Sequence, residues 1–168
     1  MSAAADLLFA ALHATWPPAA WHEAPGWRVG AGDGGGQRVS CGLALSGDAE
    51  PEALCAAQRQ LGQPPLAMLR PGEDALDAAL AGRGWQLRDP TLALAAPVAR
   101  LATAPPRVTA FTVEGPPLRV QREIWAAAGI GEARLSVMAR ACGPKVSLMG
   151  RMRDRPAAAG FAACHGEV

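Results

Sequence analysis

The sequence lacks several features that mark common classes of protein. It has no tyrosine, a single lysine (Lys145), and aromatic side chains at only 5% of its 168 positions. Its 16 basic residues nearly balance its 15 acidic ones, so the formal net charge is +1. Nucleic-acid-binding proteins concentrate positive charge on one face, so this balance argues against a nucleic-acid partner. The short basic patch of Arg151, Arg153 and Arg155 is interrupted by Asp154, which is typical of a solvated hairpin turn.

The sequence also lacks the clustered ligands of a metal site. Its cysteines (Cys41, Cys55, Cys142 and Cys164) include no C-x-x-C pair, and its histidines (His13, His22 and His165) are scattered. Cys164 and His165 are adjacent, but side chains at successive strand positions point to opposite faces. We therefore expect small, buried, apolar cysteines, no metal, and no oxidising compartment.

Long apolar runs are missing as well. None approaches the roughly 18 residues that a membrane-spanning helix needs. The Ala- and Leu-rich start, residues 1–16, contains Asp6 and no basic residue, unlike a signal peptide. We expect a cytoplasmic protein without a membrane partner. Half of the residues are hydrophobic, which is enough for a packed core in one ordinary domain or two very small ones.

What is present includes a glycine-rich segment, WRVGAGDGGGQRVSCGLAL, at residues 27–45. Gly30 to Gly35 spell G-x-G-x-x-G, as in a dinucleotide-binding loop. Such a loop must lead into a helix whose N-terminus holds the pyrophosphate. After Gly36, however, Val39, Cys41, Leu43 and Leu45 alternate with other residues, which predicts a half-buried strand. Glu50 and Glu52 have the spacing of the acidic residue that contacts a ribose, but they lie at a predicted helix start. We therefore predict a flexible hairpin and no nucleotide.

Periodicity and turn residues predict the order α-β-β-α-β-α-β for residues 1–98. The helices span residues 2–16, 51–61 and 73–82, and the strands span 27–31, 39–45, 66–69 and 85–95, the last bent at Pro90. Leu54, Ala57 and Leu61 share one helix face, and Leu76, Ala79 and Leu80 share another. Residues 1–98 thus form an N-terminal α/β domain.

Residues 99–117 are punctuated by prolines and predict a linker with at most one short strand, at 108–113. Residues 118–168 predict two helices and a hairpin. Val120, Ile124 and Ala127 face inward from the first helix, and Leu135, Met138, Ala139 and Cys142 from the second. The strands, 145–150 and 158–165, are joined by RMRDRPA. Nothing after the hairpin covers its last strand, so we expect an open edge and an incomplete sheet.

The paired helices LRVQREIWAAAGIGEARLSVMARACG, followed by the hairpin PKVSLMGRMRDRPAAAGFAACHGEV, resemble the opening half of a GNAT-type N-acetyltransferase domain. The first segment, with LGQPPLAMLRPGEDALDAALAGRGW, is similar to the N-terminal region of bacterial GNAT proteins built from two GNAT-like halves. The resemblance spans nearly the whole chain through patterns of size and polarity. It implies an α+β fold whose central, mostly antiparallel sheet is flanked by helices and is incomplete in the second half. It also implies acetyl transfer from acetyl-CoA to a primary amine of a small molecule or peptide.

No site residue is transferred by this resemblance. The family holds acetyl-CoA with an R/Q-x-x-G-x-G/A loop whose N–H groups bind the pyrophosphate, and no such string occurs here. The expectation is therefore a chain that stops before that loop. The family's general acid, often a tyrosine, is missing too. Glu167 lies where some members place a carboxylate that accepts the amine proton, although it is more typical of a solvated turn. Trp125 and Met138 could line an acceptor pocket, although apolar helix residues are typical of a core.

Three hypotheses remain open. The first is an N-acetyltransferase-family protein, inactive as this chain because the cofactor loop is missing. The second is a non-catalytic partner module whose final strand augments another sheet, including that of a second copy in a homodimer. The third is a small-ligand sensor with a pocket in the first half.

Overall fold

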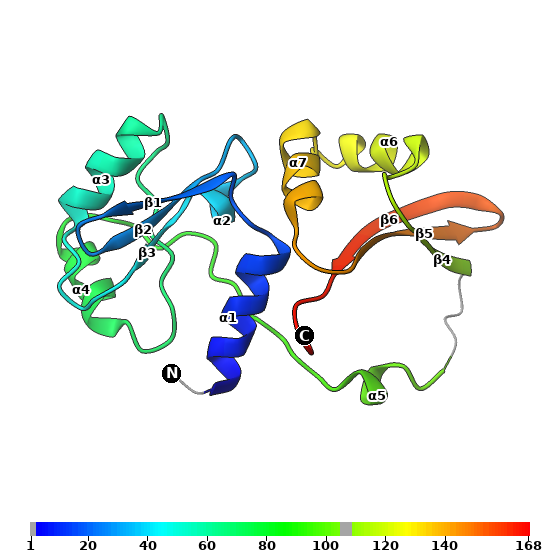
Figure 1. The fold of residues 1–168 in the computed structure, drawn as a ribbon, viewed down its shortest axis with the longest axis horizontal. Coiled ribbons are helices and arrows are strands. Elements are labelled where there is room, and N and C mark those ends of the chain that lie inside the picture. Colours follow the sequence, from blue (N-terminus) through cyan, green and yellow to red (C-terminus); the bar gives the residue numbers. More distant parts are fainter. Residues whose placement is uncertain (1–2, 105–108) are drawn as a thin grey trace.

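The computed structural model describes residues 3–104 and 109–168, which form two lobes with one three-stranded antiparallel sheet each (Figure 1). The first lobe contains α1 (Ala3–Thr15), β1 (Ala20–Ala24), β2 (Trp27–Ala31), α2 (Gln37–Ser40), β3 (Gly42–Ala44), α3 (Pro51–Gln60) and α4 (Asp74–Gly82). After α5 (Val98–Leu101), the second contains β4 (Thr109–Val113), α6 (Arg119–Ala127), α7 (Glu132–Arg140), β5 (Lys145–Met152) and β6 (Arg155–Ala163). The predicted α+β class is confirmed, with two sheets. The predicted helix residue Ser2 and strand residue Val108 lie outside the described residues.

The first sheet has the strand order β1-β2-β3. β1 and β2 form a hairpin in which Ala24 pairs with Trp27, and Gly26 occupies the turn with a φ of +74°. A positive φ is strained for residues with a Cβ, so glycine suits this turn. β2 lies where the sequence predicts it, whereas β1 is not predicted.

The core of the first lobe lies between this sheet and two helices. Trp27 and Val29 of β2 are fully buried against Leu54 of α3 and Leu76 and Leu80 of α4. The indole Nε1 of Trp27 donates to a backbone oxygen, that of Glu50, at 2.8 Å, so the buried ring keeps a hydrogen bond. The two helices match the predicted ranges, and their inward leucines are confirmed.

Two predicted strands of this lobe are wrong. Residues 66–69 form only an isolated parallel bridge between Gly42 and Ala67. The side chain of Gln58 replaces a strand partner there, because it both donates to the oxygen of Leu66 and accepts from its N–H, each at 2.8 Å. Residues 85–95 have no sheet partner in the described chain, and Trp85 alone among them is not exposed.

The second sheet has the order β4-β5-β6 (Figure 1). The strand predicted near residue 110 is β4, which pairs with β5 so that Phe111 lies opposite Met149. β5 and β6 form the predicted hairpin. Their turn residues, Arg153 and Asp154, have φ values of 50° and 61°, as a two-residue hairpin turn requires.

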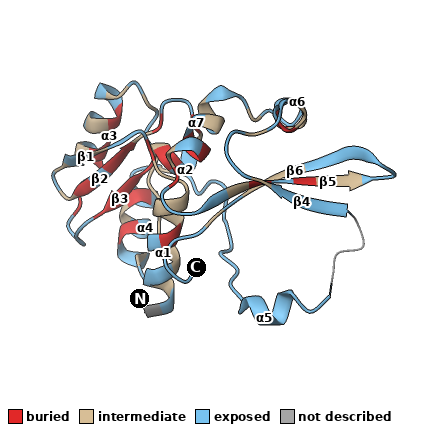
Figure 2. Cartoon of the chain, turned by 45° about the vertical axis from the view of Figure 1, so that its right-hand side comes forward, coloured by how far each residue is buried: buried red, intermediate tan, exposed pale blue. Residues whose placement is uncertain are grey.

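α6 covers one face of this sheet (Figure 2). Its buried side chains are Gln121 and Trp125, whereas the predicted inward residue Ala127 is exposed. The face differs because the amide of Gln121 is fully hydrogen-bonded inside the lobe and can therefore replace an apolar side chain. In α7, Val137 and Met138 are buried, whereas the predicted inward residues Ala139 and Cys142 are exposed.

The lobes contact each other at the end of α1. The backbone N–H of Cys142 donates to the oxygen of Ala14 at 2.9 Å. The rings of Trp16 and Phe161 meet edge to face, with centroids 6.2 Å apart. Within the described ranges, no helix has the length and apolar character needed to cross a membrane.

Candidate functional site

The glycine-rich loop between β2 and β3 is the first candidate site. The structure places the one-turn helix α2 directly after Gly36, so the prediction of a continuous strand over 39–45 is wrong. Val39 is buried within α2, residues 41–44 are all buried, and Leu45 is exposed, so burial here does not alternate as it would along one half-buried strand. β2 and β3 do form an antiparallel pair, as a hairpin requires.

Three N–H groups of this loop, those of Gly30, Gly32 and Gly35, are hydrogen-bonded within the protein. That of Gly32 donates to Oε1 of Gln63 at 2.6 Å, and that of Gly35 donates to the oxygen of Gly32 at 2.8 Å. The amide nitrogen of Gln63 also donates to the oxygen of Gly30 at 2.9 Å. A phosphate cradle needs several N–H groups directed at the ligand, and the N–H groups of Gly32 and Gly35 already have acceptors.

The glycines instead allow close packing against the second lobe. A Cβ on Gly35 would lie 2.5 Å from Cγ2 of Val137, and one on Gly34 would lie 3.4 Å from Cβ of Ala133. A Cβ on Gly36 would lie 3.6 Å from Nε and Nη2 of Arg134. Since Val137 is fully buried, the loop forms part of the contact between the lobes. That this loop binds no nucleotide stays a prediction.

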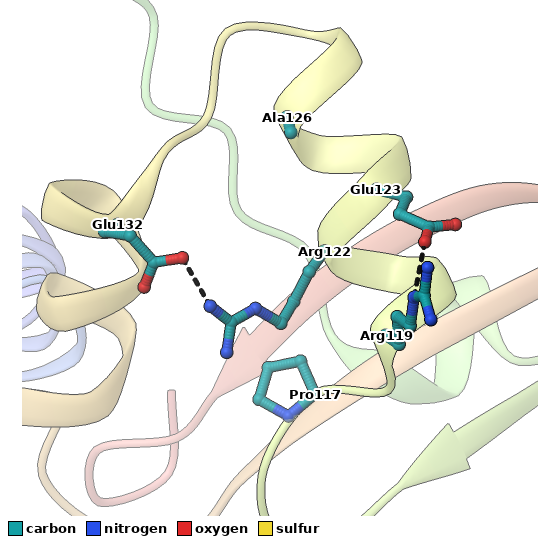
Figure 3. Close-up of a pocket in the computed structure, with 6 residues that line it drawn as sticks. All are labelled: Pro117, Arg119, Arg122, Glu123, Ala126 and Glu132. Carbon is teal, nitrogen blue, oxygen red and sulfur yellow. Dashed lines mark hydrogen bonds and ion pairs between the residues drawn. The ribbon is translucent and has the colours of Figure 1, made fainter.

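The second candidate site is a shallow hollow over α6 (Figure 3). It is lined by Pro117, Arg119, Arg122, Glu123, Ala126 and Glu132. Its four charged side chains form two ion pairs, Arg119 with Glu123 (Nε to Oε1, 2.8 Å) and Arg122 with Glu132. The positive charges are thus neutralised and exposed, so the hollow offers no concentrated charge to a ligand.

The third candidate site is a hollow in the first lobe, lined by Pro51, Glu52, Cys55, Arg59, Arg83 and Trp85. Arg83 spans its rim, with Nη2 at 3.3 Å from Oε2 of Glu50 and Nε at 3.2 Å from Oε1 of Glu52. The two glutamates with ribose-contact spacing are therefore ion-paired to an arginine. Exposed pairs of this kind contribute little stability and leave little free charge.

The residues considered for an acceptor pocket and for a proton-accepting carboxylate line neither hollow. Trp125 and Met138 are buried core residues. Glu167 is exposed in the turn after β6, where His165 and Val168 exchange two backbone hydrogen bonds. These three residues do not form one site.

Sequence reasoning missed a cluster around His13, at the end of α1. Its ring meets the ring of Trp21 in β1 edge to face, with centroids 5.5 Å apart. The guanidinium of Arg28 lies over the same Trp21 ring, 4.6 Å from its centroid. Burial lowers the pKa of His13, and the positive charges of Arg28, Arg70 and Arg38 lower it further. A neutral imidazole can accept a proton, but His13 lines neither hollow.

The cysteines are all free thiols. Cys41 is buried as predicted, and burial raises its pKa to about 11, so its thiol stays protonated and unreactive. The prediction of burial is wrong for Cys142 and Cys164, which are exposed, and Cys55 is half-buried. Across residues 3–104 and 109–168, no three His, Cys, Asp or Glu side chains gather as metal ligands would.

Comparison of the chain with protein-family models, curated proteins and solved structures finds no match. Its function must therefore be inferred from its own topology and surfaces.

Proposed function

We propose that this chain belongs to the GNAT-type N-acetyltransferases, which transfer the acetyl group of acetyl-CoA to a primary amine. The supporting observation is the element order of the second lobe: strand β4, helices α6 and α7, then strands β5 and β6. The sheet order β4-β5-β6 is antiparallel throughout, with α6 on one face. This order extends the resemblance seen in the sequence, where paired helices precede a hairpin, by one strand before the helices.

The side chains of this lobe hold α6 firmly on the sheet. Oε1 of Gln121 accepts from the N–H of Leu118 at 2.7 Å and from Oγ of Ser147 at 3.1 Å. Its amide nitrogen donates to the oxygen of Leu148 at 3.1 Å. One buried glutamine thus fixes both the start of α6 and its position over β5. A rigid support of this kind favours precise placement of a substrate on the lobe.

The described residues do not fit the pyrophosphate of acetyl-CoA. The glycine loop has the N–H groups of Gly32 and Gly35 hydrogen-bonded and packs against α7, and the hollow over α6 has its arginines paired. We therefore assign no residue to cofactor binding and no catalytic step to this chain.

The test is an assay of CoA release from acetyl-CoA with a panel of primary amines. The protein is assayed as it is expressed in its host, and we expect CoA release above the background of acetyl-CoA and amine without protein. No release with any amine of the panel contradicts the proposed activity.

A second candidate function is partner binding through the edge of β6. β6 pairs with β5 on one side, and no described strand pairs with its other side. No charged residue occurs between Arg155 and the end of this strand. Edge strands of soluble proteins usually contain charges that prevent pairing, so an uncharged edge favours β-augmentation by a partner.

A further inference from the structure

Residues 91–96, with the sequence TLALAA, form an apolar segment without regular secondary structure and without a strand partner. Leu92 and Leu94 are 86% and 89% exposed. No backbone group of these six residues makes a hydrogen bond to the described chain. Pro90 and Pro97 bracket the segment, and it contains no charged residue. In an extended segment, Leu92 and Leu94 share one face, which would make that face a good partner for a sheet edge.

The free edge of β6 has a complementary shape. Gly160 lies opposite Leu148 of β5, and Ala162 lies opposite Val146, so these residues share one face of the sheet. It is the face away from α6, because Ser147, whose hydroxyl bonds Gln121, points to the other. Leu148 is exposed there, and the small residues of β6 leave space beside it.

We propose that residues 91–96 of one copy of this chain add as an antiparallel strand to the β6 edge of a second copy. Leu92 would lie opposite Ala162, and Leu94 opposite Gly160. Directly opposed residues of antiparallel strands share a face, so both leucines cover the apolar strip beside Leu148. On the other face, Ala93 faces the bulky ring of Phe161. Large side chains thus meet small ones at each position.

The charges flanking the two segments favour this orientation. Arg100 follows the donor segment but lies in the helix α5, and the pairing brings it to the end of β6 that begins with Arg155, so it does not decide the orientation. Arg88 precedes the segment and comes to the other end, near Glu167. A parallel arrangement would instead place Arg88 beside Arg155, and like charges opposite each other are destabilising.

The occupant is a second copy because each chain contains both halves of the pairing. Two copies exchanging residues 91–96 bury both exposed segments and both β6 edges, and close a two-fold dimer. An unrelated partner on β6 would leave Leu92 and Leu94 in water. This inference rests on the second candidate function, the β6 edge, and is independent of acetyl transfer.

The experiment measures the dimer dissociation constant of residues 1–168 by analytical ultracentrifugation. We expect a dimer that Leu92→Lys and Ala162→Glu each weaken about tenfold or more, because each removes apolar contact at the pairing. The double variant restores affinity, because lysine and glutamate then lie opposite each other. Leu87→Lys is the matched control: Leu87 is also exposed, lies outside the segment, and should neither weaken the dimer nor restore the Ala162→Glu variant.

Circular dichroism of each variant confirms folding, which the exposure of Leu92 and Ala162 favours. A protein that stays monomeric up to about 1 mM contradicts both the dimer and the second candidate function. If Ala162→Glu weakens the dimer and Leu92→Lys does not, the β6 edge is part of the interface but residues 91–96 are not the strand that pairs with it. If neither substitution weakens the dimer, neither the β6 edge nor residues 91–96 form the interface, and the proposal is wrong.

Discussion

Gly35 of the glycine-rich loop contacts Val137 of α7 so closely that a Cβ on this glycine would lie 2.5 Å from the valine Cγ2. The two residues are more than one hundred positions apart and belong to different lobes. Gly35 therefore allows this packing between the lobes, because a side chain at its position would not fit beside Val137.

We expect Gly35→Ala to lower the free energy of unfolding by about 1–3 kcal/mol, since overpacking a buried contact forces neighbours to move. The same Cβ would also lie 2.9 Å from the oxygen of Gly32. Urea unfolding followed by tryptophan fluorescence measures the change. Gly47→Ala is the control, because no atom lies within 4 Å of its Cβ position. Equal stability of the two variants would show that the loop does not pack on α7.

Gln58 is the buried polar residue whose loss should cost most in the first lobe. Its side chain donates to the oxygens of Ser40 and Leu66 and accepts from the N–H of Leu66, each at 2.8 Å. Gln58→Met leaves the N–H of Leu66 unpaired, whereas the two oxygens keep the N–H of Gly42 and the amide of Gln63 as donors. We therefore expect a loss of about 2 kcal/mol in the free energy of unfolding. Gln60→Met, at an exposed position of the same helix, should change it little. A Gln58→Met protein as stable as the Gln60→Met control would contradict these bonds.

His13 should make stability depend on pH. Its folded-state pKa is lowered below 6.5 by burial and by nearby arginines, so the unfolded chain takes up a proton at a higher pH than the folded one. Above pH 6.5, His13 therefore does not affect the free energy of unfolding. As the pH falls from 6.5 toward the lowered pKa, protonation of His13 in the unfolded chain reduces that free energy. We expect His13→Gln to reduce this loss in urea unfolding between pH 7 and 5, and the exposed His22→Gln to leave it unchanged. If the free energy of unfolding of the His13→Gln protein depends on pH as that of the wild-type protein does, this prediction is wrong.

The edge strand β6 should be less protected than the central strand of either sheet in dilute solution. β5 is hydrogen-bonded on both sides, whereas β6 is bonded on one, so local opening costs less at β6. Hydrogen exchange at low protein concentration should be faster at Phe161 than at Val29 of the central strand β2. Protection at Phe161 should rise with concentration if the edge pairs. Equal protection of Phe161 and Val29 in dilute protein would contradict the open edge.

Local signals in the sequence predict part of the fold correctly. Pro51 at the first position of α3 and Gly62, with a φ of +66°, after its end define that helix through backbone preferences alone. The polar turn at Arg153 and Asp154 defines the second hairpin in the same way. These elements depend on residues close in sequence, so their patterns are visible without the fold.

The remaining elements depend on contacts between distant residues. Gln58 satisfies the backbone of Leu66 with its side chain, so an apolar run there needs no strand partner. β1, with the sequence AWHEA, has no clear alternation and forms because β2 offers it an edge. The candidate site differs for the same reason: the role of the glycine loop is set by Val137, more than one hundred residues away.

The central claim is that the loop from Gly30 to Gly36 is a packing surface between the lobes and binds no nucleotide. The most direct test is a titration of ¹⁵N-labelled protein with NAD, ATP and acetyl-CoA, following the amide resonances of the loop. The N–H groups of Gly32 and Gly35 already have acceptors at 2.6 and 2.8 Å, so we predict that their resonances do not shift with any of the three. Saturable shifts of these glycine resonances at micromolar ligand would contradict the account.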